Sequence, residues 1–375
     1  MTAVRHLYVH LPFCAHRCGY CDFVTVVGRQ GLHERYVDAL LVELELESAV
    51  LARRLETVFL GGGTPTFTEA GALRRLLGAL PSAAELTVEA NPETVTPELA
   101  LLLRESGVTR VSLGAQSFRP HLLQVLERRA TPDDVGRAFY HLRDACFDNI
   151  SIDLLHGIPG QSAADLELDI DEALALAPEH ISYYELEAKP GTRFTHAHGV
   201  ELARQCEAME GYFEAIIERL TAAGYRWYET ANFCLASAHA GGRDLRARHN
   251  LAYWLGRDYL GLGIGAVSTL GPERRRNTPR LNGYIAALGR AERPARELEA
   301  LDPGVRALER VMLGLRLDEG LPFAAAEGSL DQAALGRLER LGLATRRPGR
   351  DGPEALVLTA RGRRLGGAVT AELLA

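Results

Sequence analysis

Short apolar runs alternate with stretches of helical spacing over the first half of the chain. The runs are rich in β-branched and aromatic residues, which is typical of strands buried on both faces. Between most of them, apolar residues recur every three or four positions, which predicts amphipathic helices. This alternation predicts a parallel α/β architecture. Strands are predicted at 4–11, 57–60, 85–90, 109–117, 149–155 and 180–186, and helices at 33–55, 69–79, 97–106, 119–127, 132–145 and 163–177.

The pattern changes after residue 200. A long amphipathic helix is predicted over 201–224, and a block rich in glycine and aromatic residues follows over 225–270. Apolar content falls over 271–300, which we interpret as a linker or irregular connector. Beyond it, two helices (303–315 and 331–341), a small hairpin and a last helix resemble a winged helix. We therefore divide the chain into three parts: 1–230, 231–300 and 301–375.

Composition narrows the classes of protein that the chain can be. With 375 residues, 47% apolar and 24% charged, it can bury a core and is not wholly disordered. No apolar run approaches the roughly 18 residues of a membrane span. The formal net charge of −7 weakens a nucleic-acid-binding interpretation, which would need a basic domain. The N-terminus shows no apolar leader, so we expect a cytoplasmic protein that binds no nucleic acid.

Three of the six cysteines, Cys14, Cys18 and Cys21, lie within eight residues. Three thiolates on one short loop can hold three irons of a [4Fe–4S] cluster, which leaves the fourth iron open to a small molecule. The alternative is a structural zinc site with His16 or His10 as the fourth ligand, although zinc sites usually combine two separated ligand pairs. We expect the remaining cysteines to be small buried hydrophobic residues: Cys146, Cys206 and Cys234.

Polar or glycine-rich segments stand where the predicted strands end. Besides the cysteine loop, they are Gly61–Thr66, Glu89–Pro92, Gln116 and Asp153–Gln161. In a barrel the carboxyl ends of parallel strands meet at one rim, which carries the chemistry of such folds. A glycine run also lets the backbone approach a ligand and offer N–H groups to it. We therefore expect these segments to line one site.

The spacing Cys14-x-x-x-Cys18-x-x-Cys21 is similar to the signature of the radical S-adenosylmethionine (SAM) superfamily. The stretches Tyr8–Phe13 and Tyr20–Phe23 resemble one branch of it, which contains the oxygen-independent coproporphyrinogen III oxidases and the HemW-type heme chaperones. The resemblance extends over nearly the whole chain. It implies a [4Fe–4S] cluster whose open iron binds the amino and carboxylate groups of SAM.

The resemblance also implies a role for each matching position. Gly62, Gly63 and Thr64 match the motif that contacts the SAM amino group. Arg128 matches an arginine that pairs with the SAM carboxylate, for which a guanidinium is a suitable donor. The remaining matches lie near SAM, its ribose or the cluster: Glu89, Gln116, Asp153, Tyr8 and Tyr20.

The block from Arg248 to Trp254 contains His249, Tyr253 and Trp254 and resembles the His-Asn-x-x-Tyr-Trp signature of the HemW-type proteins. A neutral imidazole beside two large aromatic rings could bind heme iron while the rings cover the macrocycle. The other interpretation is a structural histidine. If His249 is not the ligand, the next candidates are His10, His156 and His180.

These expectations combine into one hypothesis. The fold is a partial parallel (β/α)6 radical SAM barrel with a small, helical, winged-helix-like C-terminal domain. The resemblance implies a heme chaperone that binds a [4Fe–4S] cluster, SAM and heme and transfers heme to a hemoprotein such as a respiratory cytochrome, with peripheral contact to membrane-bound recipients. The alternative is an oxygen-independent coproporphyrinogen III oxidase. Phe23 stands where the oxidases of the resemblance have a further cysteine, which argues against enzyme activity of that kind.

Overall fold

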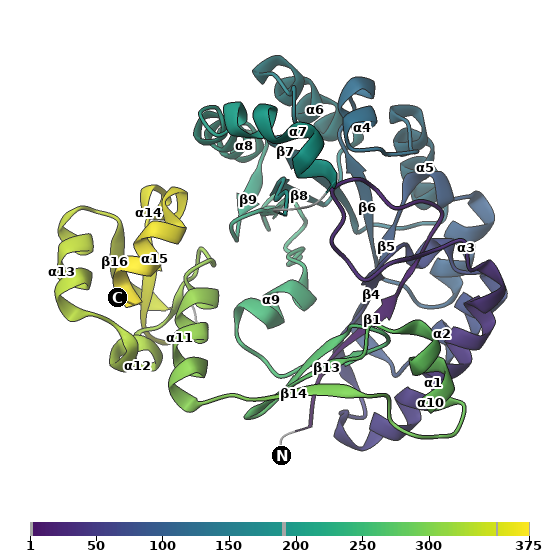
Figure 1. Ribbon diagram of the computed structural model, residues 1–375. Helices are drawn as coiled ribbons and strands as arrows, with labels where there is room; N and C mark the ends of the chain where they lie inside the picture. Colours follow the sequence, from purple (N-terminus) through teal and green to yellow (C-terminus); the bar gives the residue numbers. More distant parts are fainter. Residues whose placement is uncertain (1–2, 190–192, 350–351, 375) are drawn as a thin grey trace.

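A row of parallel strands forms the centre of the molecule in the computed structural model, which describes residues 3–189, 193–349 and 352–374. Each of the six predicted strands is present and pairs in parallel with its neighbour in chain order, so the predicted parallel α/β fold is confirmed. The sheet curves into an open barrel (Figure 1). Its parallel strands are β1 His6–Leu11, β4 Leu55–Gly62, β5 Ala83–Ala90, β6 Arg110–Gln116, β7 Ile150–His156 and β8 His180–Glu185.

Helices surround this barrel on the outside. Two of these helices begin with a capping box. The hydroxyl groups of Thr131 and Ser162 accept hydrogen bonds from the backbone N–H groups three residues later, and the carboxylates of Asp134 and Asp165 accept from the backbone N–H groups of Thr131 and Ser162. The helices are α1 His33–Glu47, α2 Ala70–Ala79, α3 Pro97–Glu105, α4 Pro120–Val125, α5 Pro132–Asp144 and α6 Ala163–Leu176.

The predicted single helix over 201–224 is wrong, because the chain forms two helices here, α7 Arg193–Gln205 and α8 Met209–Ala222. The side-chain amide of Gln205 donates to the carbonyl oxygens of Ile158 and Gln161, each at 2.9 Å. The hydroxyl of Tyr212, in the second helix, donates to the same Gln161 carbonyl at 2.7 Å. Both helices are thus fastened to the loop after β7, and the chain turns between them.

The sheet continues beyond the six parallel strands on both edges. Beside β1, β11 Leu260–Leu262 adds a further parallel strand. Beside β8, β10 Asn232–Leu235 runs antiparallel and is followed by β9 Tyr225–Trp227. Two strands of the segment 231–300 therefore belong to the central sheet. The same segment supplies α9 Arg248–Trp254, which packs against β4.

The stretch 271–300 is not an irregular connector, so that prediction is wrong. It contains β13 Glu273–Asn277, α10 Leu281–Leu288 and β14 Arg296–Ala300, and the two strands form a three-stranded antiparallel sheet with β12 Val267–Leu270. Its arginines pair with two buried carboxylates of α1. Arg296 donates to Glu43 at 3.1 Å and to Glu47 at 3.0 Å. The charged composition reflects these ion pairs rather than a solvated linker.

The C-terminal region has its own hydrophobic core, which includes Val311, Leu356 and Leu373. Its order of helix, strand, two helices and hairpin is that of a winged helix, as predicted. The region lies beside the barrel (Figure 1), and its loop residue Asp318 accepts two bonds from Arg226 of β9, at 2.7 and 2.9 Å. Its elements are α11 Pro303–Gly314, β15 Leu321–Pro322, α12 Phe323–Ala326, α13 Gln332–Arg340, β16 Ala344–Gly349, β17 Gly352–Leu358, α14 Ala360–Arg364 and α15 Gly366–Leu374.

No helix in the described part of the chain is both long and apolar enough to cross a membrane.

Candidate functional site

A pocket of about 410 Å³ opens inside the barrel at the carboxyl ends of the strands. Eleven of the thirteen residues predicted from the sequence line it, which brings the cysteine loop and the strand ends to one rim. Tyr8 and His249 are not among the lining residues. Those that line it are Cys14, Cys18, Tyr20, Cys21, Gly62, Gly63, Thr64, Glu89, Gln116, Arg128 and Asp153.

The cysteine loop begins at the end of a two-stranded parallel ribbon, β2 Phe13–Cys14 and β3 Val26–Val27. The Thr64 hydroxyl donates to Cys14 Sγ at 3.5 Å, and Arg128 Nη1 donates to Cys18 Sγ at 3.7 Å. Burial raises the pKa values of the Cys14 and Cys21 thiols. Bound metal would lower these values, because a coordinating thiol is deprotonated.

The three thiols fit an iron–sulfur cluster better than a single metal ion. Within residues 3–189, 193–349 and 352–374, no three cysteine, histidine or acidic side chains lie close enough to hold one ion together. A cubane takes one thiolate on each of three irons, so its ligands need not converge on a point. His10 is a poor fourth zinc ligand here, because its ring nitrogens bond Tyr8 Oη at 3.0 Å and the Val24 carbonyl at 2.8 Å.

The glycine run is needed for close packing behind the pocket. Gly62 has a φ of +109°, and a Cβ atom there would overlap the His10 ring. A Cβ at Gly63 would lie 2.5 Å from the Pro12 carbonyl oxygen. The sequence suggested that this run offers free N–H groups to a ligand, but the structure shows them engaged. The N–H of Gly62 donates to Glu89, and those of Gly63 and Thr64 donate to the backbone carbonyls of Leu11 and Phe13. The glycines are therefore required by the contacts with His10 and Pro12 behind the pocket, and the N–H groups of Gly62, Gly63 and Thr64 are not available to a ligand.

Two carboxyl groups lie deep in the pocket. Burial, with the nearby Asp153, raises the pKa of Glu89 to about 7, while the N–H of Gly62 opposes the shift with a bond of 3.1 Å. Burial also raises the pKa of Asp153, although Ser112 donates to it at 2.8 Å and Ser151 at 3.1 Å. A cationic ligand between these groups would remove the burial penalty on their charges.

Arg128 brings a guanidinium to the pocket beside the cysteine loop. Its Nη2 donates to the Gly114 carbonyl at 2.8 Å and to Asn91 Oδ1 at 3.1 Å. Its Nε is buried without a partner among the described residues, which leaves a donor for a ligand carboxylate. Gln116 lies nearby with a φ of 67°, at an irregularity in the pairing of β6 with β7.

Tyr20 and Tyr8 occupy different surroundings. Tyr20 lines the pocket, packs edge-on against Phe194 with 6.4 Å between ring centres, and has its pKa raised by burial. Tyr8 lies beneath the pocket, where it stacks on Phe59 and bonds His10. Tyr8 is thus placed to support the pocket floor rather than to touch a ligand.

His249 lies in α9 with both ring nitrogens in use. Its Nδ1 bonds Thr57 Oγ1 at 2.7 Å and its Nε2 bonds Tyr253 Oη at 2.9 Å. The side chain is 1% exposed, and burial lowers its pKa to about 3. The Trp254 ring lies under the guanidinium of Arg316 from the C-terminal region, at 4.3 Å. Iron binding by His249 would require at least one of these hydrogen bonds to break.

Asn91, in the predicted segment Glu89–Pro92, lines the pocket and links two of its other residues, because its side chain donates to Thr64 at 3.2 Å and accepts from Arg128. Arg110 also lines the pocket, but it was not predicted from the sequence. Arg110 is the first residue of β6, so the expectation that site residues lie at the carboxyl ends of strands could not identify it. The prediction that the lone cysteines are all buried is wrong, since Cys146 and Cys206 are exposed and only Cys234 is buried.

An open parallel barrel with a three-cysteine loop at its mouth defines the radical SAM class of proteins. Comparison with known proteins agrees, since residues 8–173 match the model of the Radical SAM superfamily. The Heme chaperone HemW of Mycobacterium tuberculosis is 37% identical over 98% of this chain and 94% of its own. The proteins of the same name from Bacillus subtilis and Escherichia coli are 34% and 35% identical, over 85% and 84% of this chain and 85% and 83% of their own. The chain therefore belongs to the HemW family of the radical SAM superfamily.

A solved structure has the same fold. The coproporphyrinogen III oxidase HemN from Escherichia coli, described as a radical SAM enzyme, superimposes with a TM-score of 0.75 over 99% of this chain and 90% of its own. The two sequences are 22% identical. This likeness concerns the architecture, including the C-terminal region.

Proposed function

We propose that the protein is a cytoplasmic heme chaperone that binds a [4Fe–4S] cluster, SAM and heme and transfers heme to a recipient hemoprotein. The observation that carries the proposal is the near full-length similarity to proteins named Heme chaperone HemW, together with the three-cysteine pocket. Recipients embedded in a membrane would be reached by peripheral contact, since heme must pass from one protein surface to the other.

The pocket residues fit the cofactors in the proposal. Cys14, Cys18 and Cys21 would hold the cluster. When bound, the cluster supplies an open iron for the amino and carboxylate groups of SAM and can transfer one electron. The free Nε of Arg128 would bind the SAM carboxylate. The Glu89 carboxyl group accepts a hydrogen bond from the N–H of Gly62. A positively charged ligand beside it would favour its ionised form.

The alternative function is oxidative decarboxylation of coproporphyrinogen III. The superposition on the solved oxidase supports the shared fold alone. Phe23 lines the pocket and is 63% exposed, so an apolar ring stands where the resemblance expects the oxidase cysteine. The proposal therefore favours the chaperone.

One pair of assays tests the proposed function. Anaerobically purified, cluster-loaded protein is titrated with hemin while the Soret absorbance is followed, and a parallel sample receives coproporphyrinogen III with SAM and a reductant. We expect stoichiometric hemin binding and no decarboxylated product. Turnover of coproporphyrinogen III at a useful rate, or failure of the wild type to bind hemin, would refute the proposal.

A further inference from the structure

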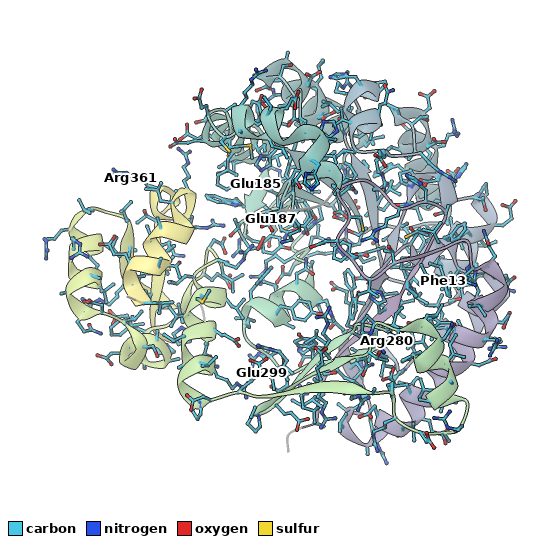
Figure 2. The ribbon with its side chains drawn as sticks, viewed as in Figure 1. Phe13, Glu185, Glu187, Arg280, Glu299 and Arg361 are labelled. Atoms are coloured by element: carbon cyan, nitrogen blue, oxygen red, sulfur yellow. The ribbon has the colours of Figure 1, made fainter. Side chains whose placement is uncertain are left out.

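A second and larger cavity, of about 730 Å³, lies between the barrel and the C-terminal region. Its walls come from the ends of β7 and β8, from α8, and from α11, α14 and α15 across the gap. Figure 2 labels Glu185, which lies on the side of the barrel that faces the C-terminal region and lines both this cavity and the cysteine pocket. Its volume is in the range of roughly 300–1,000 Å³ that is typical of small-molecule sites.

The strands β7 and β8 form the wall between the two hollows. Side chains alternate between the two faces of a strand. Leu155 and Tyr184 point into the cysteine pocket, whereas their neighbours His156 and Tyr183 point into the second cavity. One layer of strands therefore separates the SAM-side pocket from the second cavity.

His156 differs from the other histidines considered as heme ligands. His10 and His249 have both ring nitrogens engaged, and so does His180, which bonds Ser151 at 2.8 Å and Tyr228 at 2.9 Å. His156 makes no side-chain hydrogen bond to any described residue, and its Nδ1 is buried without a partner. Its ring is stacked on Phe213 with 6.3 Å between ring centres.

The imidazole of His156 is a neutral base in this setting. Burial lowers its pKa to about 4, so the ring keeps its lone pair at neutral pH. A neutral imidazole is the form that binds iron.

Thioether groups approach the same cavity. The chain has three methionines, and the two that follow Met1 both line it: Met209 of α8 and Met312 of α11. The Met209 sulfur packs against Gly157, the residue after His156, since a Cβ there would lie 2.8 Å from it. Met312 is 53% exposed on the C-terminal side. Methionine and histidine together are an axial pair for heme iron.

Aromatic rings connect His156 to the guanidinium of Arg363, two of whose nitrogens have no partner among the described residues. Phe213 meets Trp227 edge-on at 5.7 Å, and Arg363 lies over Trp227 at 3.6 Å. The Nη1 of Arg363 donates to the Trp227 carbonyl, while its Nε and Nη2 are buried without a partner among the described residues. Glu185, Glu210 and Glu214 also line the cavity, and Arg364 pairs with Glu214 at 2.7 Å. Free donors for an anionic ligand are therefore the Nε and Nη2 of Arg363 and the Nε of Arg316, which also lines the cavity and has no partner among the described residues.

We infer that this cavity is the heme site, with His156 as an iron ligand, a thioether of Met209 or Met312 on the metal, and Arg363 binding a propionate. The inference rests on the proposed function, because it names the place where the cargo binds. Flat aromatic walls suit the macrocycle, and a guanidinium suits its carboxylates. The His-Asn-x-x-Tyr-Trp block supports the site indirectly, since Trp254 packs on Arg316, which lines the cavity.

The test uses the full, cluster-loaded chain and two ligands, hemin and iron-free protoporphyrin IX. His156→Ala should shift the Soret band and weaken hemin binding at least tenfold, with little effect on protoporphyrin IX, which has no iron to bind. Arg363→Ala should weaken both ligands at least several-fold. His121→Ala, at an exposed histidine of α4, should change neither.

A second pair of variants does not depend on the buried imidazole. Met312→Arg puts a long charged group into the cavity and should lower hemin affinity at least tenfold. Leu308→Arg, on the same helix and 39% exposed but not lining the cavity, should leave it unchanged. Cluster absorbance and thermal unfolding report whether each variant is folded.

The possible results distinguish an error in the proposed heme site from an error in the proposed function. If the wild type binds hemin and both Met312→Arg and His156→Ala behave like it, the cavity is not the heme site and the chaperone proposal stands. If His249→Ala alone shifts the Soret band, the ligand is His249 and the inference is overturned. If the wild type binds no hemin, the proposed function itself fails.

Discussion

The pocket at the mouth of the barrel and the cavity beside the C-terminal region are built in different ways. The first takes most of its side chains from strand ends and from one short loop, and its polar atoms are held by neighbours such as Asn91 and Thr64. The second is closed by two parts of the chain that are far apart in sequence, and polar contacts such as Arg226 to Asp318 join these parts. A permanently bound cofactor suits the first arrangement. A ligand that must leave suits the second, because parting of the two walls would open it.

The largest effect is expected at the cysteine loop. Cys18→Ala removes one of three ligands and should abolish the cluster entirely, because three thiolates are all that the loop supplies. Iron and sulfide analysis after anaerobic reconstitution measures the loss. Cys146→Ala, at an exposed cysteine outside both hollows, is the control and should retain a full cluster. A preparation of the wild type that contains zinc and neither iron nor sulfide would contradict the cluster assignment.

The sequence predicted the first region far better than the second, and the reason is physical. Parallel strands must bring their carboxyl ends to one rim, so Glu89, Gln116 and Asp153 could be placed together without coordinates. Pairing of the arginines in 271–300 with Glu43 and Glu47 depends on tertiary contacts, and composition alone suggested a linker. The second cavity likewise requires α8 to face α11, and no spacing rule links residues 209 and 312.

Glu89 gives the next largest expected effect, on the pH dependence of stability. Its pKa is about 7 in the folded chain and near 4.5 when unfolded, so the folded state holds the proton more tightly. The contribution of Glu89 to the free energy of unfolding is therefore complete below pH 4.5. It falls by about 3 kcal/mol as the pH rises to 7. Urea unfolding of cluster-free wild type and Glu89→Gln at pH 5 and pH 8 measures the difference.

The control for this experiment is Glu93→Gln, at an exposed residue of the same rim. It should keep the pH dependence of the wild type, whereas Glu89→Gln should flatten it. Parallel curves for wild type and Glu89→Gln would show that Glu89 does not hold a proton in the folded pocket.

Arg128→Ala tests the ligand side of the mouth. Removing a charged donor to a carboxylate should weaken SAM binding to cluster-loaded protein by roughly 1.5–3 kcal/mol. Calorimetric titration measures the change, and Arg129→Ala is the neighbouring control. If SAM binds Arg128→Ala and wild type equally well, the SAM carboxylate lies elsewhere in the pocket. Hemin affinity should not follow this change, since Arg128 does not line the second cavity.

The weakest effect is expected at the contact between the two walls of the second cavity. Asp318→Asn weakens the contact between the C-terminal region and Arg226, whose two hydrogen bonds to this carboxylate are 2.7 and 2.9 Å long. Both side chains are partly exposed, so the loss should be no more than about 1 kcal/mol. Because the pair holds one wall of the second cavity against the other, hemin affinity should fall a few-fold while SAM affinity stays unchanged. Glu339→Gln, which breaks an ion pair with Arg346 inside the C-terminal region, should alter neither. Equal losses of hemin and SAM affinity in Asp318→Asn would mean that the two sites respond to the C-terminal region as one unit.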